Sequence, residues 1–280
     1  MQSGLRPINA ILLSGYEVQQ ILAQKSNDVS LDLGMSLTKV FVTEAGVQVG
    51  EKLLSWDVLH SMSERPEDVY LIGEKISKLA WFDRSYYRLV VPGFRQPPTV
   101  EINGIRMHRT VDISPLDDAK AKVSLFDELL GKTVLDICTG LGYTAISEIG
   151  RGAEKVVTVE HDVNVLRMAA YNPWSRALFQ PKIDIVVDDV VRYLEKCDVA
   201  FDAVMHDPPT YKIAGHLYSM ELYTAVYNVM RRGAVLVHYV GQPGIKRGVQ
   251  FYRGVLNRLR KAGFKPIYIP EVQCVKAFKL

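Results

Sequence analysis

The chain has few of the features that mark secreted, membrane or metal-binding proteins. Its 280 residues include only three cysteines, which lie far apart and form no Cys-x-x-Cys pair. This argues against a disulfide framework and a zinc site, and it indicates a reducing compartment. No apolar run approaches the ~20 residues of a membrane-spanning helix, and residues 1–7 lack a charged-then-apolar signal pattern. We therefore expect a cytoplasmic protein with no membrane partner and no bound metal.

An excess of charge of one sign is also missing. The chain has 34 Lys and Arg against 31 Asp and Glu, a net charge of +3. Such a balance neither requires nor excludes nucleic acid, because an electrostatic footprint needs clustered charge. With 48% hydrophobic residues and no repeats, the chain suits one large or two medium domains. The sequence leaves the oligomeric state open, a homo-oligomer included.

The first 115 residues predict a small, mostly β accessory domain. Ser14 and Glu17 form the pattern of a capping box, which predicts a short helix after Ser14. Asn103-Gly104 separates two alternating apolar runs, which predicts a hairpin with a two-residue type I′ turn. Short alternating runs elsewhere in this half also favour small antiparallel strands.

The boundary between the two halves lies near Pro115, so we predict domains over 1–115 and 116–280. Directly after this boundary, Asp117 or Asp118 can cap a helix that ends near Gly131.

The second domain alternates strand and helix patterns. Strands are predicted over 133–138, 156–160, 183–187, 201–206 and 234–240, with helices between them. This alternation predicts an α/β, Rossmann-like, mostly parallel sheet. The last two strands, 266–270 and 274–278, are too closely linked for a parallel crossover and should form an antiparallel edge hairpin. The helix over 219–230 is expected to be ended by Gly233.

A glycine-rich turn follows the first of these strands. Gly140 and Gly142 can adopt positive φ and carry no Cβ, so a ligand can approach the backbone closely. The amides that open the next helix point toward such a ligand. Asp136, at the strand end, is expected to project its carboxylate into the same crevice. With Ala145 the stretch fits a loose G-x-G-x-x-A pattern, which by itself also describes a tight turn without a ligand.

Acidic residues follow the carboxyl ends of successive strands, where open α/β sheets bind ligands. They are Asp136, Glu160, Asp188, Asp189 and Asp207. Glu160 is placed to accept hydrogen bonds from ribose hydroxyls, and an acid after the third strand can accept a hydrogen bond from an adenine amine. Each acid alone could instead cap a helix, but four acidic strand ends favour a nucleotide-like ligand. A nicotinamide dinucleotide remains an alternative, although Asp136 would repel its pyrophosphate.

The loop after the fourth strand is Asp-Pro-Pro-Thr-Tyr. Pro208 and Pro209 cannot extend the strand and stiffen the loop, which makes Asp207 a fixed acceptor suited to an amino group. Tyr211 could stack on a planar group or supply a hydroxyl. A rigid turn with a capping Asp207 is the alternative, and His206 is an alternative base.

Over residues 116–280 the chain resembles the class I S-adenosylmethionine-dependent methyltransferases. The matching segments are 135–142, 159–160, 187–189 and 207–211. By this resemblance, S-adenosyl-L-methionine would be held by Asp136, Thr139, Gly140, Gly142, Glu160, His161, Asp188 and Asp189. The catalytic loop would consist of Asp207, Pro208, Pro209 and Tyr211. It matches the (Asp/Asn)-Pro-Pro-(aromatic) motif of enzymes that methylate amino nitrogens on nucleobases or proteins, except that Thr210 takes the aromatic position.

The chain also resembles the spermidine-synthase-like aminopropyltransferases, which share this fold and follow a small N-terminal β domain. The matching segments are 187–194 and 217–223. In that family an Asp after the fourth strand deprotonates the attacking amine, and Asp207 matches it. Their Asp-Ser-Ser-Asp is Asp-Pro-Pro-Thr here, and their acidic glycine loop is Cys-Thr-Gly-Leu-Gly-Tyr. This resemblance implies decarboxylated S-adenosylmethionine and a polyamine.

We therefore expect a transferase that uses S-adenosylmethionine and methylates an amino nitrogen of RNA, protein or a small molecule. Aminopropyl transfer is the alternative. A non-catalytic nucleotide- or RNA-binding protein is a second alternative, because basic and aromatic residues interleave in 84–88, 94–95 and 106–109. Residues 238–244 resemble uncharacterised archaeal methyltransferase-like proteins, which fixes no substrate.

Overall fold

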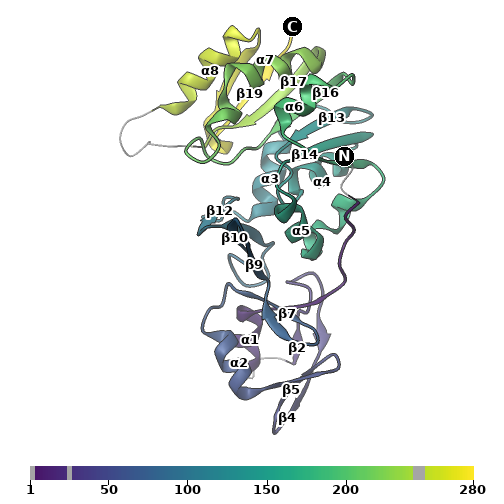
Figure 1. Cartoon of the computed structure of the whole chain (residues 1–280), viewed down its shortest axis with the longest axis vertical. Helices are drawn as coiled ribbons and strands as arrows, with labels where there is room; N and C mark the ends of the chain where they lie inside the picture. Colours follow the sequence, from purple (N-terminus) through teal and green to yellow (C-terminus); the bar gives the residue numbers. More distant parts are fainter. Residues whose placement is uncertain (1–3, 24–26, 242–249) are drawn as a thin grey trace. The chain divides into compact units, whose positions relative to one another are not determined.

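The computed structural model describes residues 4–23, 27–241 and 250–280 of the chain (Figure 1). By internal contacts the chain divides into two compact units. The sheet unit contains Leu116–Val163 and Leu178–Leu280, and the N-terminal unit contains Leu5–Pro115 together with Asn164–Ala177. The segment Asn164–Ala177, which interrupts the second half of the sequence, therefore packs with the N-terminal unit.

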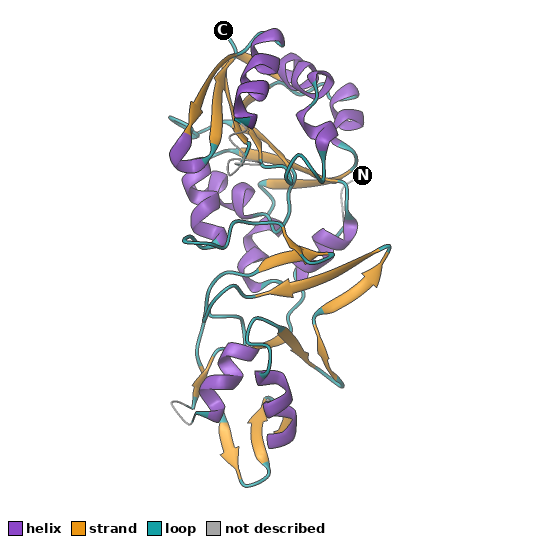
Figure 2. Ribbon diagram, turned by 90° about the vertical axis from the view of Figure 1, so that its left-hand side faces the viewer, coloured by secondary structure: helices purple, strands orange, loops and turns teal. Residues whose placement is uncertain are grey.

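A seven-stranded sheet forms the centre of the sheet unit (Figure 2). Its strands are β13 (Thr133–Ile137), β14 (Lys155–Glu160), β15 (Ile183–Val187), β16 (Phe201–His206), β17 (Met230–Tyr239), β18 (Lys265–Ile269) and β19 (Cys274–Phe278). Their order is β15-β14-β13-β16-β17-β19-β18, with five parallel strands and an antiparallel pair at one edge. The predicted mostly parallel sheet with an antiparallel edge hairpin is confirmed.

The strand order reverses between β13 and β16, because the chain runs outward from β13 to β15 and then returns to begin again at β16. In open α/β sheets the crevice at such a switch point, outside the carboxyl ends of the strands, is where ligands bind. The topology therefore places the candidate site at the ends of these two central strands.

Helices of the sheet unit pack on the seven-stranded sheet through apolar faces. The helices of the described chain are α1 (Gly15–Leu22), α2 (Trp56–Ser63), α3 (Pro115–Val123), α4 (Tyr143–Gly150), α5 (Val163–Tyr171), α6 (Val190–Glu195), α7 (Met220–Val229) and α8 (Phe251–Lys261). Leu222 and Val226 on α7 and Leu259 on α8 are buried with Leu135 and Val204 of the sheet in one apolar cluster. None of these helices is both long enough and apolar enough to span a membrane.

Two predicted helices, α3 and α7, begin or end at other residues in the structure. Helix α3 begins at Pro115, a favoured first position because proline has no N–H to satisfy there, so Asp118 lies inside the helix. The same helix ends at Val123, well before Gly131. After α7, Gly233 lies within β17 at φ 82° and does not end the helix, because the chain already pairs with β16 from Met230 onward.

The N-terminal unit consists of small antiparallel sheets. Its strands are β1 (Ile11–Ser14), β2 (Asp28–Val29), β3 (Thr38–Lys39), β4 (Phe41–Thr43), β5 (Gly46–Val49), β6 (Lys52–Ser55), β7 (Val69–Ile72), β8 (Ile76–Lys78), β9 (Ala80–Asp83), β10 (Ser85–Val90), β11 (Thr99–Ile102) and β12 (Ile105–Arg106). Asn103 (φ 50°) and Gly104 (φ 80°) both have positive φ, which confirms the predicted I′-type hairpin. Ser14 caps α1 by accepting from the Glu17 amide at 3.2 Å, as predicted. The Glu17 carboxylate, however, pairs with Arg95 at 2.6 Å.

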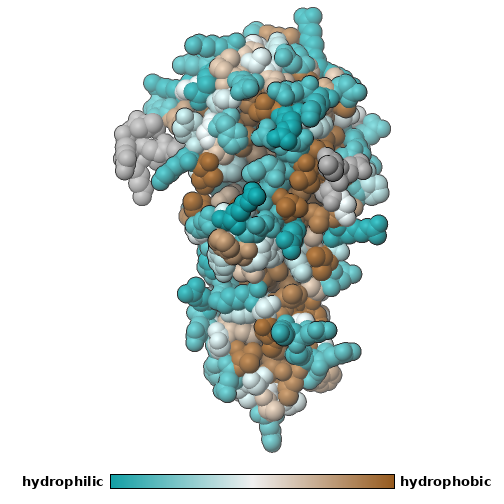
Figure 3. Space-filling view, in the orientation of Figure 1, coloured by the Kyte–Doolittle hydropathy of each residue, from teal (hydrophilic) through white to brown (hydrophobic). Residues whose placement is uncertain are grey.

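The sheet β4-β5-β6 is apolar on both faces. Val47 and Leu54 are buried on the inner face, whereas Phe41 and Leu53 lie opposite Gln48 on the outer face. Phe41 is 73% exposed and Leu53 is 47% exposed. Figure 3 shows apolar residues among hydrophilic ones on the visible face of this unit.

Candidate functional site

Backbone hydrogen bonds join the carboxyl ends of the central strands. The Asp207 amide donates to the carbonyl of Ile137 at 3.2 Å, and the Asp188 amide donates to the carbonyl of Glu160 at 3.1 Å. The Cys138 amide donates to the carbonyl of Val159 at 3.0 Å. The four acidic strand ends predicted from the sequence are therefore neighbours at one edge of the sheet.

The glycine loop after β13 has an unusual backbone. Cys138, Gly140 and Gly142 all have positive φ, at 73°, 56° and 80°. Positive φ is unfavourable for a residue with a Cβ, so strain at Cys138 adds to the two glycine requirements. Helix α4 follows Gly142 without a side-chain cap. The sequence therefore correctly indicated where glycine is needed.

Replacing Gly142 by alanine is expected to destabilise the fold by about 1–2 kcal/mol, because the added Cβ must adopt a left-handed conformation. That Cβ would also lie 2.7 Å from side-chain atoms of the buried Leu178. The control is Gly150→Ala at the end of α4, where a Cβ meets nothing within 4 Å and φ is not positive. Urea unfolding should show Gly142→Ala below wild type and Gly150→Ala at or above it. Equal free energies of unfolding for the two variants would contradict the expected strain of a Cβ at position 142.

Glu160 is fixed by backbone donors. Its Oε2 accepts from the Gly140 amide at 3.1 Å, and its Oε1 accepts from the Asp162 amide at 3.0 Å. The ring of His161 lies 3.2 Å from the same Oε1. The hydrogen bond to Glu160 raises the pKa of His161, against the opposing effect of burial. Oε2, which accepts from one amide, keeps a further lone pair and allows Glu160 to accept a hydrogen bond from a ligand.

The two acids after β15 differ in their surroundings. Asp189 is the N-cap of α6, and its Oδ1 accepts from the amides of Val191 at 2.9 Å and Arg192 at 3.2 Å. Asp188 accepts from the Asp189 amide at 2.9 Å and lies 3.6 Å from the Arg192 guanidinium. Its side chain is 25% exposed. In both acids these contacts fall on Oδ1, so the second carboxylate oxygen of either one can accept a hydrogen bond from a ligand.

Asp136 and Thr139 point beneath the loop. Asp136 is fully buried and accepts from the Thr158 hydroxyl at 2.6 Å, because the two residues are register partners on β13 and β14. The Thr139 hydroxyl lies 2.6 Å from that of Thr158, which extends the chain of hydrogen bonds. The expected projection of the Asp136 carboxylate into an open crevice is therefore corrected by its complete burial.

The sequence interpretation did not include Glu148, a buried residue of α4. Neither of its carboxyl oxygens has a hydrogen-bond partner within the described ranges. Burial, with a smaller contribution from Asp136, raises the pKa of Glu148 well above its ordinary value. Burial also raises the pKa of Asp136 to about 7, although hydrogen bonds from Thr158 and Thr144 oppose the rise. The helical spacing of Thr144 and Glu148 (i, i+4) was the signal available in the sequence.

The buried acids should make stability depend on pH. The folded pKa of Asp136 lies above its ordinary value of 3.8, so its stabilising protonation is complete below about pH 4 and is lost as pH rises through about 7. For a shift of this size the contribution of Asp136 to the free energy of unfolding should fall by about 2 kcal/mol between pH 5 and pH 8. Urea unfolding of wild type and Asp136→Asn at both pH values should show this contribution as the difference between the two pH dependences, because Glu148, His206 and His238 titrate in both proteins. The same difference in Asp136→Asn and wild type would contradict the assignment.

A buried lysine holds the loop after β16. Lys122 of α3 donates to both carboxylate oxygens of Asp207, each at 2.8 Å, and lies 2.7 Å from Asp118. Its Nζ is 4.0 Å from the ring centroid of Tyr239. Burial lowers the pKa of Lys122, but Asp207 and Asp118 outweigh it and raise the pKa above its ordinary value. The sequence interpretation missed Lys122, although its spacing from Asp118 (i, i+4) is visible in the chain.

The remaining loop residues join an aromatic group. The Tyr218 hydroxyl donates to the Pro209 carbonyl at 2.9 Å, which fixes the loop. Tyr211 is 49% exposed and lies with its ring centroid 5.7 Å from that of Tyr218 and 5.1 Å from that of Phe251. Tyr211 thus has an exposed edge that can line a ligand site.

The two histidines at the ends of β16 and β17 are buried. His206 and His238 stack with their centroids 4.2 Å apart, and His238 Nε2 lies 3.0 Å from the Tyr223 hydroxyl. Burial lowers the pKa of His238 to about 3 and the pKa of His206 well below its ordinary value. Both rings are therefore neutral, and the His206 ring has no access to solvent for the alternative role of general base.

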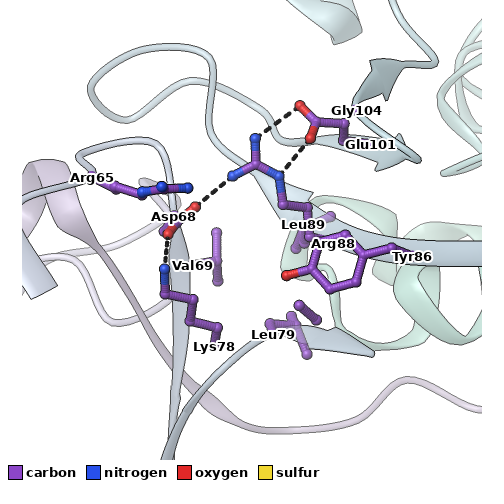
Figure 4. Close-up of a pocket in the computed structure, with 11 residues that line it drawn as sticks. Arg65, Asp68, Val69, Lys78, Leu79, Tyr86, Arg88, Leu89, Glu101 and Gly104 are labelled. Atoms are coloured by element: carbon purple, nitrogen blue, oxygen red, sulfur yellow. Dashed lines mark hydrogen bonds and ion pairs between the residues drawn. The ribbon is translucent and has the colours of Figure 1, made fainter. Parts of the chain in front are cut away.

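The N-terminal unit has a cavity of its own, of ≈ 230 Å³ (Figure 4). The Arg88 guanidinium lies between Glu101 and Asp68, and Lys78 pairs with Asp68 from the other side. Arg106 likewise pairs with Glu67. Of the basic residues that suggested RNA binding, Arg88, Arg95 and Arg106 are thus paired with acids of the same unit. Residues 246–247, a further basic stretch, lie outside the described residues.

The combination of this sheet order, a glycine loop at the switch point and acidic strand ends is that of nucleotide-binding α/β domains. The chain belongs to the S-adenosylmethionine-dependent methyltransferase-like superfamily. The family model described as "Conserved hypothetical protein 95" matches residues 115–238. The uncharacterized protein MJ1233 of Methanocaldococcus jannaschii is 40% identical over 255 residues, which cover 88% of this chain and 87% of that protein.

Other similarities are to enzymes of polyamine synthesis. A polyamine aminopropyltransferase of Thermoplasma volcanium is 28% identical over 141 residues, and the match spans 49% of each chain. The crystal structure of a spermidine synthase from Thermotoga maritima superposes with a TM-score of 0.54 and 19% identity, covering 73% of this chain and 74% of that one. At this identity the structural likeness shows the fold.

Proposed function

We propose that this protein is an S-adenosylmethionine-dependent methyltransferase that acts on an amino nitrogen through the loop Asp207-Pro208-Pro209. The observation that carries the proposal is the convergence of this loop with Glu160 and the glycine turn at the reversal point of the sheet. Membership of the methyltransferase-like superfamily supports it.

The chemistry of the side chains at this edge fits S-adenosylmethionine. Glu160 offers a carboxylate oxygen to the ribose hydroxyls, and Asp188 or Asp189 offers one to the adenine amine. Glu148 and Asp136 are buried acids beneath the glycine loop, and the oxygens of Glu148 lack partners within the described residues. An α-ammonium group of the methionine end would give them a counter-charge. Gly140 carries no Cβ, which allows close approach of a ligand to the backbone.

In the proposed mechanism the protein mainly positions the acceptor and excludes water. The cofactor supplies an electrophilic methyl group on a sulfonium. Asp207 accepts a hydrogen bond from an N–H of the substrate amine. This bond turns the nitrogen lone pair toward that methyl group. Pro208 and Pro209 keep the carboxylate in place, and the exposed edge of Tyr211 lines the acceptor side. The amino proton leaves through Asp207 or water after transfer.

Aminopropyl transfer is the second candidate, and the aminopropyltransferase among the relatives favours it. Two sequence features count against it. The glycine loop contains no acid, because Leu141 stands between its two glycines and is fully buried. Thr210 takes the place of the second acid of the Asp-Ser-Ser-Asp motif, which leaves Asp207 alone in the loop.

A calorimetric titration distinguishes the two candidates. The protein is titrated with S-adenosylmethionine, its decarboxylated form and methylthioadenosine. Tighter binding of S-adenosylmethionine, which carries the carboxylate, is the result expected for a methyltransferase. Tighter binding of the decarboxylated form would overturn methyl transfer in favour of aminopropyl transfer. Binding of none would overturn both.

A further inference from the structure

We propose that Lys122 is a positioning residue that occupies the place of an ammonium group at Asp207 and thereby excludes alkylammonium acceptors. Lys122 lies on α3, at the start of the sheet unit, and reaches the end of β16 across 85 residues of sequence. The inference rests on the proposed function, since it concerns the acceptor of the same site.

The geometry is that of a complete ion pair. Both oxygens of Asp207 accept from Lys122 Nζ at 2.8 Å, and the lysine side chain is only 4% exposed. Asp118, itself 2% exposed, accepts a further hydrogen bond from the same ammonium, with Nζ and Oδ2 2.7 Å apart. The Tyr239 ring covers the charge at 4.0 Å, where a cation is attracted to the ring face. Lys122 is therefore held by three groups at once, and moving it away would leave two acidic side chains without their partner at a large cost in free energy.

The consequence concerns the charge of the acceptor. A polyamine is an alkylammonium at neutral pH, and it must both pair with a carboxylate and lose a proton before it can attack. At Asp207 the ammonium of Lys122 already fills that position, so a second alkylammonium would have to displace it from Asp207. An amino group conjugated to an aromatic ring or a carbonyl is neutral. Such an amino group needs only to donate one N–H hydrogen bond to the carboxylate. The Asp207 carboxylate, although paired with Lys122, still has a lone pair for that hydrogen bond.

The test is calorimetric titration of putrescine into wild type and Lys122→Met, both free and saturated with methylthioadenosine. We expect Lys122→Met to bind putrescine at least about tenfold more tightly, because Asp207 and Asp118 become free to pair with it. Lys122→Arg should exclude putrescine as wild type does. Lys120→Met on the exposed side of the same helix, 60% exposed at its side chain, is the matched control and should not change binding.

A second variant covers loss of folding. Lys122→Met leaves Asp118 buried without its partner, so Asp118→Asn/Lys122→Met removes both charges and retains the volume. The double variant should still bind putrescine more tightly than wild type, through Asp207. Equal putrescine affinity in wild type and the double variant would overturn the inference. So would aminopropyl transfer to putrescine by the wild type. Failure of every cofactor to bind would overturn the proposed function instead, and the putrescine comparison in the free protein would still be readable.

Discussion

Asp207→Asn is expected to lower methyl transfer by about 10²–10⁴-fold, the range typical for removal of a general base or proton acceptor. The amide keeps the shape of the side chain, and cofactor affinity should stay within about threefold of wild type, because binding energy at Glu160 is retained. Transfer is measured as label passed from methyl-tritiated S-adenosylmethionine to total RNA, total protein or small amines.

The matched control for this variant is Asp202→Asn. Asp202 lies at the opposite end of the same strand, where it accepts from the Thr133 amide at 2.9 Å and pairs with Arg231 at 2.7 Å. It should lower stability without lowering transfer per folded molecule. If Asp207→Asn transferred methyl groups as fast as Asp202→Asn, Asp207 would not be the acceptor of the amino proton.

Glu160→Ala is expected to weaken S-adenosylmethionine binding by about 100-fold, because one hydrogen bond from a ribose hydroxyl to a charged acceptor is worth roughly 1.5–3 kcal/mol. The substitution also frees the amides of Gly140 and Asp162, which loosens the glycine loop. Glu160→Gln keeps one carbonyl oxygen and should fall between alanine and wild type. Calorimetric titration of the three proteins gives the order.

The control for Glu160 is Glu154→Gln, just before the other end of β14, where the side chain is exposed. It should leave the affinity unchanged. Cofactor affinity that survives Glu160→Ala would place the ribose elsewhere and would contradict the site at the strand ends.

The meeting of the acidic strand ends at one edge of the sheet could be predicted because it depends on local sequence order. Each acidic residue follows directly on an apolar strand, and parallel strands bring their carboxyl ends to one edge. Glu160 and Asp188 were found in this way, and backbone hydrogen bonds join their strand ends as expected. The glycine turn was visible for the same reason, since positive φ at Gly140 and Gly142 is a property of the local chain.

The groups that set the electrostatics could not be read from local order. Lys122 meets Asp207 only when α3 packs beside the end of β16, and the two residues are 85 apart in sequence. Glu148 gives no sign of burial by its residue type, because glutamate on a helix is ordinarily exposed. The burial of Asp136 depends on Thr158 from the next strand. These contacts are tertiary, and the sequence shows only the helical spacing of single partners.

The most direct test of the account is the crystal structure of the protein with S-adenosylhomocysteine bound. The account predicts the ribose hydroxyls within hydrogen-bonding distance of Glu160, the adenine beside Asp188 or Asp189, and the sulfur facing the loop that begins at Asp207. A ligand bound away from the ends of β13 and β16, or a ribose that does not contact Glu160, would contradict it.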